Sequence, residues 1–467
     1  MGRMKIMSEF DVIVIGAGLA GHCATLAAAE TGASVLLIEK CDEVGGSTVL
    51  SGGFIAFADT PIQRAQGVKD DADLLLTDLR TVGGPYTQDA LLQTYVSEQQ
   101  DLYGWLTGKG LSFTEVELGS GQSAARSHAI DPGLMIATLN EAASALENVQ
   151  IRTRTTAVCL VREGQDGAVT GVTIDEGGRL SDVSARGGVV IASGGFSRSE
   201  DFLNKFAPNQ ARALRVGGPG NFGDGLRMAW RLGADVKDMG QIKGTYGAHA
   251  TECNNGQEIL LMFYRGAIIV NRAGKRFVDE SISYKLVGEA AMIQAEPVSW
   301  QIFDDAIYRE ASGSARLFDP VPALNRGLIV KADTLDELCA ACGIDTESLR
   351  NTVARYNTDA EMGLDTEFGR DGLCHHVGAL APLVTAPFYA YPSTAAVLAT
   401  YCGLAVDATS QVIDVYEDPI DGLYAAGEVM GGFHGQAYVT GSSLGKAAIF
   451  GRIAGRQAAG RAGKNSE

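Results

Sequence analysis

Residues 10–40 read FDVIVIGAGLAGHCATLAAAETGASVLLIEK, and most of the expected architecture follows from them. Residues 10–16 are an apolar run rich in β-branched side chains, which is typical of a buried parallel strand. The alanine-rich stretch after it has helical spacing and stops at Gly32, and residues 34–40 form a second apolar run. A strand, a helix and a strand of these lengths predict a βαβ unit.

A glycine triplet lies at the turn between this first strand and the helix. Gly16, Gly18 and Gly21 have the spacing G-x-G-x-x-G, and Glu39 ends the next strand. Such glycines allow a tight turn and a close approach of the backbone to a pyrophosphate, while the helix N-terminus favours phosphate charge. Glu39 is placed to accept hydrogen bonds from an adenosine ribose. We therefore predict a dinucleotide site.

After an interruption, the later part of the chain again has apolar strands that end at glycines. Residues 187–195 and 422–429 are further buried strands with glycine stops, and a closing helix follows from Ser443. The stretch between about 237 and 372 differs in pattern. We predict an α/β fold, in which a Rossmann-like FAD-binding domain carries an inserted α+β capping domain. The expected divisions are 1–236 and 373–467 for the FAD-binding domain and 237–372 for the capping, substrate-binding domain.

Charge and composition exclude several classes of function. The chain has 467 residues and a formal net charge of −18, which argues against nucleic acid as a partner. No apolar run is long enough to cross a bilayer, and the first residues lack the apolar core of a signal peptide, so we expect no membrane association. The 8 cysteines have no small-domain disulfide spacing, which favours reduced thiols and a cytoplasmic enzyme.

A metal site is conceivable but not expected. Cys339 and Cys342 form a C-x-x-C pair, and Cys374-His375-His376 follows later. The pair lies in a segment that reads as an amphipathic helix ending at Gly343, so core cysteines are the better interpretation.

The cofactor is expected to be FAD rather than NAD, because a series of glycine and hydroxyl turns follows the first motif. These turns suit an extended dinucleotide and its isoalloxazine ring. Glu428 would hold ribitol hydroxyls, and the helix opening at Ser443 would stabilise negative charge on the flavin. The full set of expected cofactor contacts is Gly16, Gly18, Gly21, Glu39, Lys40, Gly46, Ser47, Ser51, Gly52, Gly53, Ala157, Val158, Ala192, Gly194, Asp224, Gly427, Glu428, Ser443 and Leu444.

At this point the chain resembles the fumarate reductase/succinate dehydrogenase flavoprotein family, which includes the 3-ketosteroid dehydrogenases. The resemblance covers nearly the whole chain. It implies an FAD domain and a cap, with the substrate held between the cap and the flavin. The motifs that carry it are GAGLAG (16–21) with Glu39-Lys40, GGSTVLSGG (45–53), VVIASGGF (189–196), GNFGDGLRMAWRLGA (220–234), AIIVNRAGKRFVDE (267–280), DGLYAAGEV (421–429) and SLGKAAIFGRIAG (443–455).

The chain departs from the fumarate reductase pattern at the substrate positions. The place of that family's proton-donating arginine is taken by Tyr284, and its histidine pair is replaced by Leu398-Ala399. Its substrate arginine in the C-terminal loop is replaced within residues 436–441. The resemblance therefore implies loss of most of the dicarboxylate clamp. The histidine that carries covalent flavin in the respiratory subgroup is missing from residues 45–53, which implies non-covalent FAD.

The same positions look like those of a ketosteroid desaturase. That subgroup has a tyrosine just past the matching RF..ES segment, where Tyr284 stands, and a tyrosine and a glycine N–H that hold the ketone oxygen, which Tyr438 and Gly441 match. A further tyrosine of the steroid enzymes has no counterpart. Its stretch reads Arg126, Ser127 and His128.

The resemblance implies a desaturase that forms a C=C bond next to the carbonyl of a small-molecule cyclic ketone. Tyr284 would take the α-proton, and Tyr438 and Gly441 would stabilise the enolate oxygen. A small oxo-cyclohexanecarboxylate is one expected substrate, with Arg126, His128 and Arg265 as candidates for its carboxylate. The alternatives are a fumarate-reductase-like enoate reductase, a 3-ketosteroid dehydrogenase, and a flavin subunit that only relays electrons. The electron acceptor is unknown from the sequence.

Overall fold

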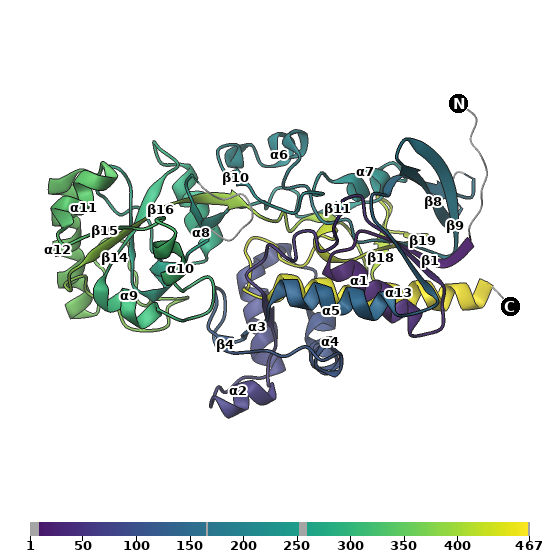
Figure 1. The fold of residues 1–467 in the computed structure, drawn as a ribbon, viewed down its shortest axis with the longest axis horizontal. Coiled ribbons are helices and arrows are strands. Elements are labelled where there is room, and N and C mark those ends of the chain that lie inside the picture. Colours follow the sequence, from purple (N-terminus) through teal and green to yellow (C-terminus); the bar gives the residue numbers. More distant parts are fainter. Residues whose placement is uncertain (1–8, 165–166, 252–258, 466–467) are drawn as a thin grey trace.

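The computed structural model describes residues 9–164, 167–251 and 259–465. The chain forms two units that lie side by side (Figure 1). One contains both chain ends, β1 and the closing helix α13, and the other contains β14, β16 and α12. No helix in the described ranges is both long and apolar enough to cross a membrane.

The first unit is built on an eight-stranded sheet in the order β18-β19-β9-β1-β2-β6, extended by β7 and β8 beside β9. β1 pairs in parallel with β2 and β9, and β19 pairs in parallel with β9. The second half of β1, residues 12–15, is buried, as its apolar run predicts. The strand bounds are β1 (Glu9–Ile15), β2 (Val35–Ile38), β6 (Val149–Arg152), β7 (Thr156–Arg162), β8 (Val169–Glu176), β9 (Arg179–Ile191), β18 (Gln411–Ile413) and β19 (Pro419–Ala425).

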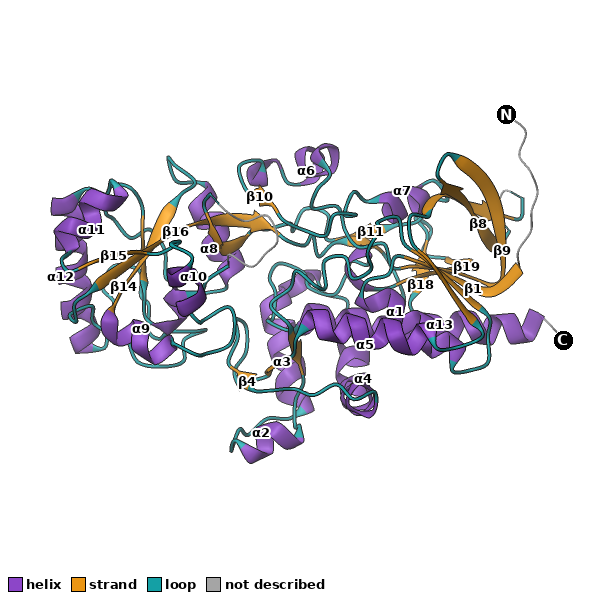
Figure 2. Cartoon of the chain, in the orientation of Figure 1, coloured by secondary structure: helices purple, strands orange, loops and turns teal. Residues whose placement is uncertain are grey.

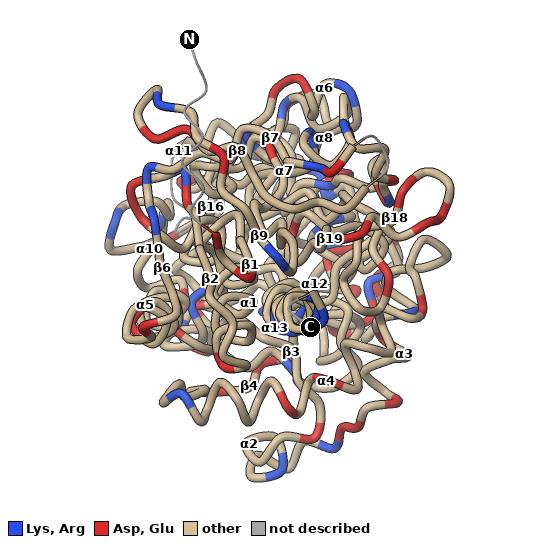
Figure 3. Tube along the Cα trace, turned by 90° about the vertical axis from the view of Figure 1, so that its right-hand side faces the viewer, with Lys and Arg blue, Asp and Glu red and all other residues tan. Residues whose placement is uncertain are grey.

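Helices cover this sheet, and the two ends of the chain meet there. α13 packs along α1, although the two helices come from opposite ends of the sequence (Figure 2). Gly455 allows this, because a Cβ there would lie 2.1 Å from the carbonyl oxygen of Ala24. Acidic and basic residues are interspersed around the outline of the molecule (Figure 3). The helices of this unit are α1 (Leu19–Ala29), α2 (Pro61–Ala65), α3 (Ala72–Gly83), α4 (Asp89–Gly108), α5 (Pro132–Ser144), α6 (Glu200–Phe206), α7 (Asp224–Trp230) and α13 (Ser442–Asn465).

The second unit is built on a six-stranded sheet with the path β10-β16-β14-β13, to which β12 and β15 add by pairing with β16. α11 packs against β15 and β16, and α8 packs against β12 and β16. The strands are β10 (Leu214–Arg215), β12 (Thr245–His249), β13 (Ile268–Val270), β14 (Ser299–Asp304), β15 (Val330–Ala332) and β16 (Phe388–Val397), and the helices are α8 (Tyr284–Met292), α9 (Asp305–Ala311), α10 (Val321–Asn325), α11 (Leu335–Cys342) and α12 (Thr346–Met362).

The predicted fold class is confirmed: the structure is a mixed α/β protein with a Rossmann-like unit and a second, α+β unit. The division at residues 236 and 372 stays a proposal. β16 lies in the third segment of that division and pairs inside the second sheet.

Two small sheets complete the fold, and a mixed apolar cluster connects the units. The small sheets are β3-β5-β4 and β11-β17. The cluster combines Phe54 and Tyr438 of the first unit with Tyr264 and Tyr284 of the second. The remaining strands are β3 (Phe54–Ala56), β4 (Val116–Glu117), β5 (Ser127–Ala129), β11 (Val236–Lys237) and β17 (Gly403–Leu404).

A buried ion cluster ties together separate segments of the second unit. The guanidinium of Arg276 donates to Glu280 at 2.6 and 2.9 Å and to Asp365 at 2.8 and 2.9 Å. Arg370 lies against the same Glu280 carboxylate at 3.4 Å, and all four residues are buried. Two cations and two anions balance each other, which is the condition for keeping charges away from water.

Candidate functional site

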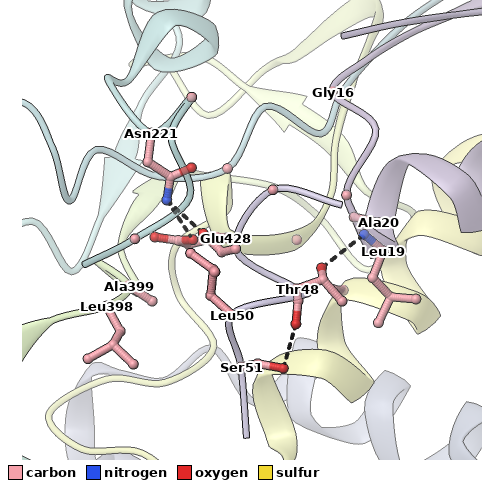
Figure 4. Close-up of a pocket in the computed structure, with 18 of the residues that line it drawn as sticks. Gly16, Leu19, Ala20, Thr48, Leu50, Ser51, Asn221, Leu398, Ala399 and Glu428 are labelled. Carbon is pink, nitrogen blue, oxygen red and sulfur yellow. Dashed lines mark hydrogen bonds between the residues drawn. The ribbon is translucent and has the colours of Figure 1, made fainter. Parts of the chain in front are cut away.

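A large cavity extends from the carboxyl ends of the first sheet to the junction with the second unit. It holds about 1750 Å³ of space not filled by protein and is partly open to solvent. Gly16 follows β1, Glu39 follows β2, Ala192 follows β9 and Gly427 follows β19, and all four line it. Figure 4 shows Gly16 among the lining residues. In α/β sheets this edge is where ligands bind.

The glycine motif combines close packing with an open face. Gly16 has a φ of +103°, and a Cβ there would lie 2.4 Å from the carbonyl oxygen of Ala192. A Cβ on Gly21 would lie 1.8 Å from the carbonyl oxygen of Gly16, so Gly21 serves the contact between helix and strand and does not line the cavity. Gly18 has room and faces the cavity. These are the separate tasks that a dinucleotide turn requires.

Glu39 is fixed by backbone N–H groups at the edge of the cavity. Its two carboxylate oxygens accept hydrogen bonds from Ala17 and Cys41, each at 2.9 Å. A carboxylate has further lone pairs, which leaves it able to accept hydroxyl groups of a ribose. Lys40 beside it forms an ion pair with Asp224.

A second acidic group, Glu428, also lines the cavity. It accepts the backbone N–H of Thr400 at 2.9 Å and the side-chain amide of Asn221 at 3.2 Å (Figure 4). Burial raises the pKa of Glu428, and the hydrogen bonds from Thr400 and Asn221 oppose this shift. The sequence reasoning missed Asn221, although it stands inside the GNFGDG motif.

These residues fit an FAD molecule. Of the expected cofactor contacts, all but Gly21 and Val158 line the cavity, and Val158 is 46% exposed on β7. The Oγ of Ser193, a lining residue that the sequence reasoning did not select, is buried and has no hydrogen-bond partner among the described residues. A buried hydroxyl without a partner is a group that a ligand would satisfy.

The far end of the cavity carries a group of tyrosines. Tyr284 begins α8 and Tyr438 lies just before α13, and their ring centroids are 6.0 Å apart. Tyr401 stacks on Tyr438 at 5.0 Å with 17° between the planes. All three line the cavity. The N–H of Gly441 donates to the Tyr438 hydroxyl at 2.9 Å, so the glycine acts on the tyrosine instead of pointing into the cavity beside it.

Both candidate catalytic hydroxyls hold their protons firmly. Burial raises the pKa of Tyr284 well above its usual range. Burial also raises the pKa of Tyr438 to about 12, against the opposing effect of the N–H groups of Gly441 and Ser443. Tyr284 is therefore ready to donate a proton, and it can accept one only after its own has left.

The rest of this end is mainly apolar, although Thr440 also lines the cavity and its buried hydroxyl has no hydrogen-bond partner among the described residues. Lys40 is the one basic side chain among the described residues that line the cavity, and Asp224 already neutralises it. The walls near the tyrosines are formed by Phe54, Val216, Ile259, Leu261, Leu317, Leu398 and Ala399. Leu398 and Ala399 stand where the resemblance places a histidine pair.

Two of the expected carboxylate ligands lie elsewhere. Arg126 is fully buried, and its guanidinium binds Asp70 at 2.6 and 2.8 Å and also pairs with Asp78. His128 hydrogen-bonds Thr60 at 2.7 Å, and burial lowers its pKa to about 4. Neither residue lines the cavity, and the charge of Arg126 is already neutralised. We therefore leave both out of the proposed substrate site.

The third candidate, Arg265, is also engaged. Its guanidinium lies 2.8 Å from Glu117 of the first unit and 4.6 Å from the ring centroid of Phe318. It does not line the cavity, although the neighbouring Leu317 does. Within the described ranges no group of three or more His, Cys, Asp or Glu is arranged to hold a metal ion.

Comparison with known proteins agrees with this geometry. Residues 11–444 match the family described as FAD binding domain. The chain is 31% identical over 462 residues to a fumarate reductase (cytochrome) of Shewanella frigidimarina, covering 97% of this chain and 78% of the relative. It is 27% identical to a 4-oxocyclohexanecarboxylate 2-dehydrogenase of Sinomonas cyclohexanicum, covering 97% and 94%.

A solved structure extends this comparison to the ketosteroid enzymes. The structure of 3-ketosteroid-Δ4-(5α)-dehydrogenase from Rhodococcus jostii RHA1 superimposes with a TM-score of 0.76 at 26% identity, covering 97% of both chains. The family match spans more than nine-tenths of the chain. The chain thus belongs to the FAD-binding flavoproteins of the fumarate reductase/succinate dehydrogenase family, oxidoreductases that act on CH–CH groups.

Proposed function

We propose that this protein is an FAD-dependent desaturase that introduces a C=C bond next to the carbonyl of a cyclic ketone. The observation that carries the proposal is the pair Tyr284 and Tyr438, whose rings lie 6.0 Å apart in the cavity that the cofactor turns also line. The 4-oxocyclohexanecarboxylate and ketosteroid dehydrogenases among its relatives, which by name act on ketones, add support.

The residues divide the chemistry between them. The Gly441 N–H donates to the Tyr438 hydroxyl, which leaves the proton of that hydroxyl free for the ketone oxygen. A hydroxyl that accepts a hydrogen bond donates a stronger one. The Gly441 N–H therefore strengthens the hydrogen bond from Tyr438 to the enolate oxygen. Tyr284 accepts the α-proton as its tyrosinate, after its own proton has passed to solvent through the open side of the cavity. FAD, when bound, supplies the acceptor for the hydride from the β-carbon. The apolar walls exclude water from the reacting carbons.

The charge of the substrate is a separate question. A small oxo-cyclohexanecarboxylate is one substrate within the proposal. The described lining offers its carboxylate no unpaired cation, because Lys40 is paired with Asp224. An uncharged ring ketone, or a steroid ketone, meets no such cost. The test must therefore vary the carboxylate independently of the ketone.

A reductase is the second candidate, and the protonation of Tyr284 favours it. An enoate reductase needs a proton donor beside the flavin, and burial keeps Tyr284 in the protonated form that can donate. The similarity to a fumarate reductase points the same way. The desaturase and the reductase would use the same residues for reactions that run in opposite directions.

Anaerobic flavin bleaching separates the candidates. The purified yellow protein is mixed without oxygen with cyclohexanone, with 4-oxocyclohexanecarboxylate and its methyl ester, and with a 3-ketosteroid. Loss of the flavin absorbance with any ketone supports the desaturase, and the acid and ester together report the effect of charge. If no ketone bleaches the flavin, but unsaturated acids reoxidise dithionite-reduced enzyme, the reductase replaces it.

We also propose a cytoplasmic location and non-covalent FAD. Seven described cysteines are free thiols, which suits a reducing compartment. Electrons leave to an acceptor that the chain does not identify. Release of the flavin into solution on acid precipitation of the protein would test the non-covalent attachment.

A further inference from the structure

Lys285 is a buried lysine directly after Tyr284 at the start of α8. Its side chain is 2% exposed, and its Nζ donates to the carbonyl oxygen of Lys243 at 3.0 Å. No carboxylate lies within salt-bridge distance of it among the described residues. Burying an ammonium with so little compensation is costly, so the fold keeps this lysine at the expense of stability.

The amine of Lys285 lies against the tyrosine group of the cavity. Its Nζ is 4.7 Å from the ring centroid of Tyr401, within the range of a cation–π contact. Tyr401 in turn stacks on Tyr438 at 5.0 Å, with its backbone in the left-handed region at a φ of +55°. The amine of Lys285 therefore contacts the ring of Tyr401, which in turn contacts the ring of Tyr438, the proposed ketone-binding residue.

A neutral histidine also contacts the ring of Tyr401. His434 makes an edge contact with Tyr401 at 4.7 Å and lies 5.4 Å from the ring centroid of Tyr438. Burial keeps the pKa of His434 well below its usual range, with the charges of Lys446 and Lys285 adding to this shift. His434 is therefore uncharged, and Lys285 supplies the positive charge over the ring of Tyr401.

We propose that Lys285 is a positioning residue for ketone binding: it holds Tyr401 against Tyr438, and its ammonium favours the negatively charged, enolate-like form of the ligand. The inference rests on the proposed ketone chemistry and adds to it a residue that touches neither substrate nor flavin. The charge acts through Tyr401 and across the low-dielectric wall of the cavity. At a separation of about 10 Å and an effective dielectric constant of about 20, one charge changes the affinity for an anion by roughly tenfold.

The effect must depend on pH in a defined direction. Burial lowers the pKa of Lys285 to about 7, and the charge of Glu428 opposes that shift. Lys446, another buried amine beside Glu428, has its pKa lowered by burial to about 8. Lys285 is an ammonium below about pH 7 and a neutral amine above it, so its help to an anionic ligand is present at low pH and is lost as pH rises through about 7.

A matched pair of ligands tests this on the FAD-loaded protein without turnover. 4-Nitrophenol ionises and mimics an enolate, whereas 4-nitroanisole has nearly the same shape and cannot ionise. Both are titrated calorimetrically against the wild type, Lys285→Met and Lys285→Arg. We expect Lys285→Met to bind 4-nitrophenol about tenfold more weakly and 4-nitroanisole nearly as well as the wild type, and Lys285→Arg to recover most of the loss.

The pH profile gives a readout that a structural role would not move. Above about pH 7, where 4-nitrophenol is mostly the anion, the ratio of wild-type to Lys285→Met affinity for it should fall towards one as Lys285 loses its proton. Lys331→Met is the control, because that lysine also lies over a ring, Tyr389, outside the cavity. Lys331→Met should change the affinity for neither 4-nitrophenol nor 4-nitroanisole.

Two outcomes would overturn the inference. Equal weakening of both ligands by Lys285→Met would mean that the lysine only supports the packing of α8, and a ratio that does not vary with pH would exclude its charge. These outcomes differ from failure of the proposed function, in which no ketone bleaches the wild-type flavin whatever stands at position 285.

Discussion

Tyr284 and Tyr438 illustrate how much of the site lies in single side chains. They come from different units of the molecule, and both line the cavity that the cofactor turns also line. Their environments differ, because Tyr438 accepts a hydrogen bond from the Gly441 N–H and Tyr284 follows an N-capping serine, Ser283. Different environments for similar groups allow one to bind oxygen and the other to move a proton.

Removal of one hydroxyl at a time tests this division. We expect Tyr284→Phe and Tyr438→Phe to slow anaerobic bleaching by the best ketone roughly 100- to 1000-fold each, because a proton carrier or an oxyanion donor is lost. The flavin should stay bound, since the rings remain. Stopped-flow absorbance measures the rate. Tyr356→Phe is the control, because Tyr356 is a buried tyrosine of the second unit outside the cavity. Full-speed bleaching by Tyr284→Phe would remove that residue from the mechanism.

The sequence allowed prediction of residues whose role is local and failed where partners are distant. Gly21 and Glu39 contact groups of their own βαβ unit, so their spacing indicated them, whereas the close packing of Gly16 is against the distant Ala192. Arg126 was expected at the substrate because it is a basic residue near a family position. Its partners are Asp70 and Asp78, which come close only through the packing of the chain around β5. No local pattern indicates such a pairing.

At the scale of elements the same distinction holds. The expected strands at residues 10–16 and 34–40 correspond to β1 (Glu9–Ile15) and β2 (Val35–Ile38), and the expected closing helix corresponds to α13. The helix expected to end at Gly343 is α11, whose terminal glycine has a φ of +68°. β16 was not anticipated. It contains Pro392 and has mixed polarity, and its place at the centre of the second sheet depends on four other strands.

The contact between α1 and α13 gives a prediction at this scale. Gly455→Ala should loosen the contact, because the new methyl group would meet the Ala24 carbonyl oxygen, and should lower both the midpoint of urea unfolding and the FAD content. Gly460→Ala on the same helix is the matched control, because a Cβ there meets nothing within 4 Å. That change should stabilise by about 0.5–1 kcal/mol, since alanine is the better helix former. Identical behaviour of the two variants would contradict the proposed packing.

The whole molecule is held together by contacts that cross long stretches of sequence. Residues at the two ends of the chain form one sheet and one helix pair, while the ion cluster of Arg276, Glu280, Asp365 and Arg370 secures the second unit. The predicted insertion explains the first arrangement. The ion cluster could not be predicted from the sequence, because charged residues in loops are usually exposed.

The ion cluster predicts how stability changes with pH. Burial alone would raise the pKa of Asp365, but the hydrogen bonds and charge of Arg276 outweigh it and hold the pKa at about 2. A depressed carboxyl pKa contributes stability that is present above the unfolded value near 4 and is lost as pH falls towards 2. We expect about 2 kcal/mol from this group, measured as urea unfolding free energy across that range.

Substitution of Asp365 provides the comparison. Asp365→Asn should remove this part of the acid dependence and should also destabilise the protein at neutral pH by about 3–5 kcal/mol, because Arg276 loses one of its counterions. A variant with the wild-type acid transition would show that Asp365 does not carry it.

The continuity of the cavity from the cofactor turns to the tyrosines also has a kinetic consequence. On the proposed function, an oxidant small enough to enter this cavity would share it with the substrate, so each would delay the other and product would leave before reoxidation. Such an enzyme alternates between two half-reactions. Its steady-state plots at different oxidant concentrations would be parallel lines, and an excess of ketone would slow its own conversion.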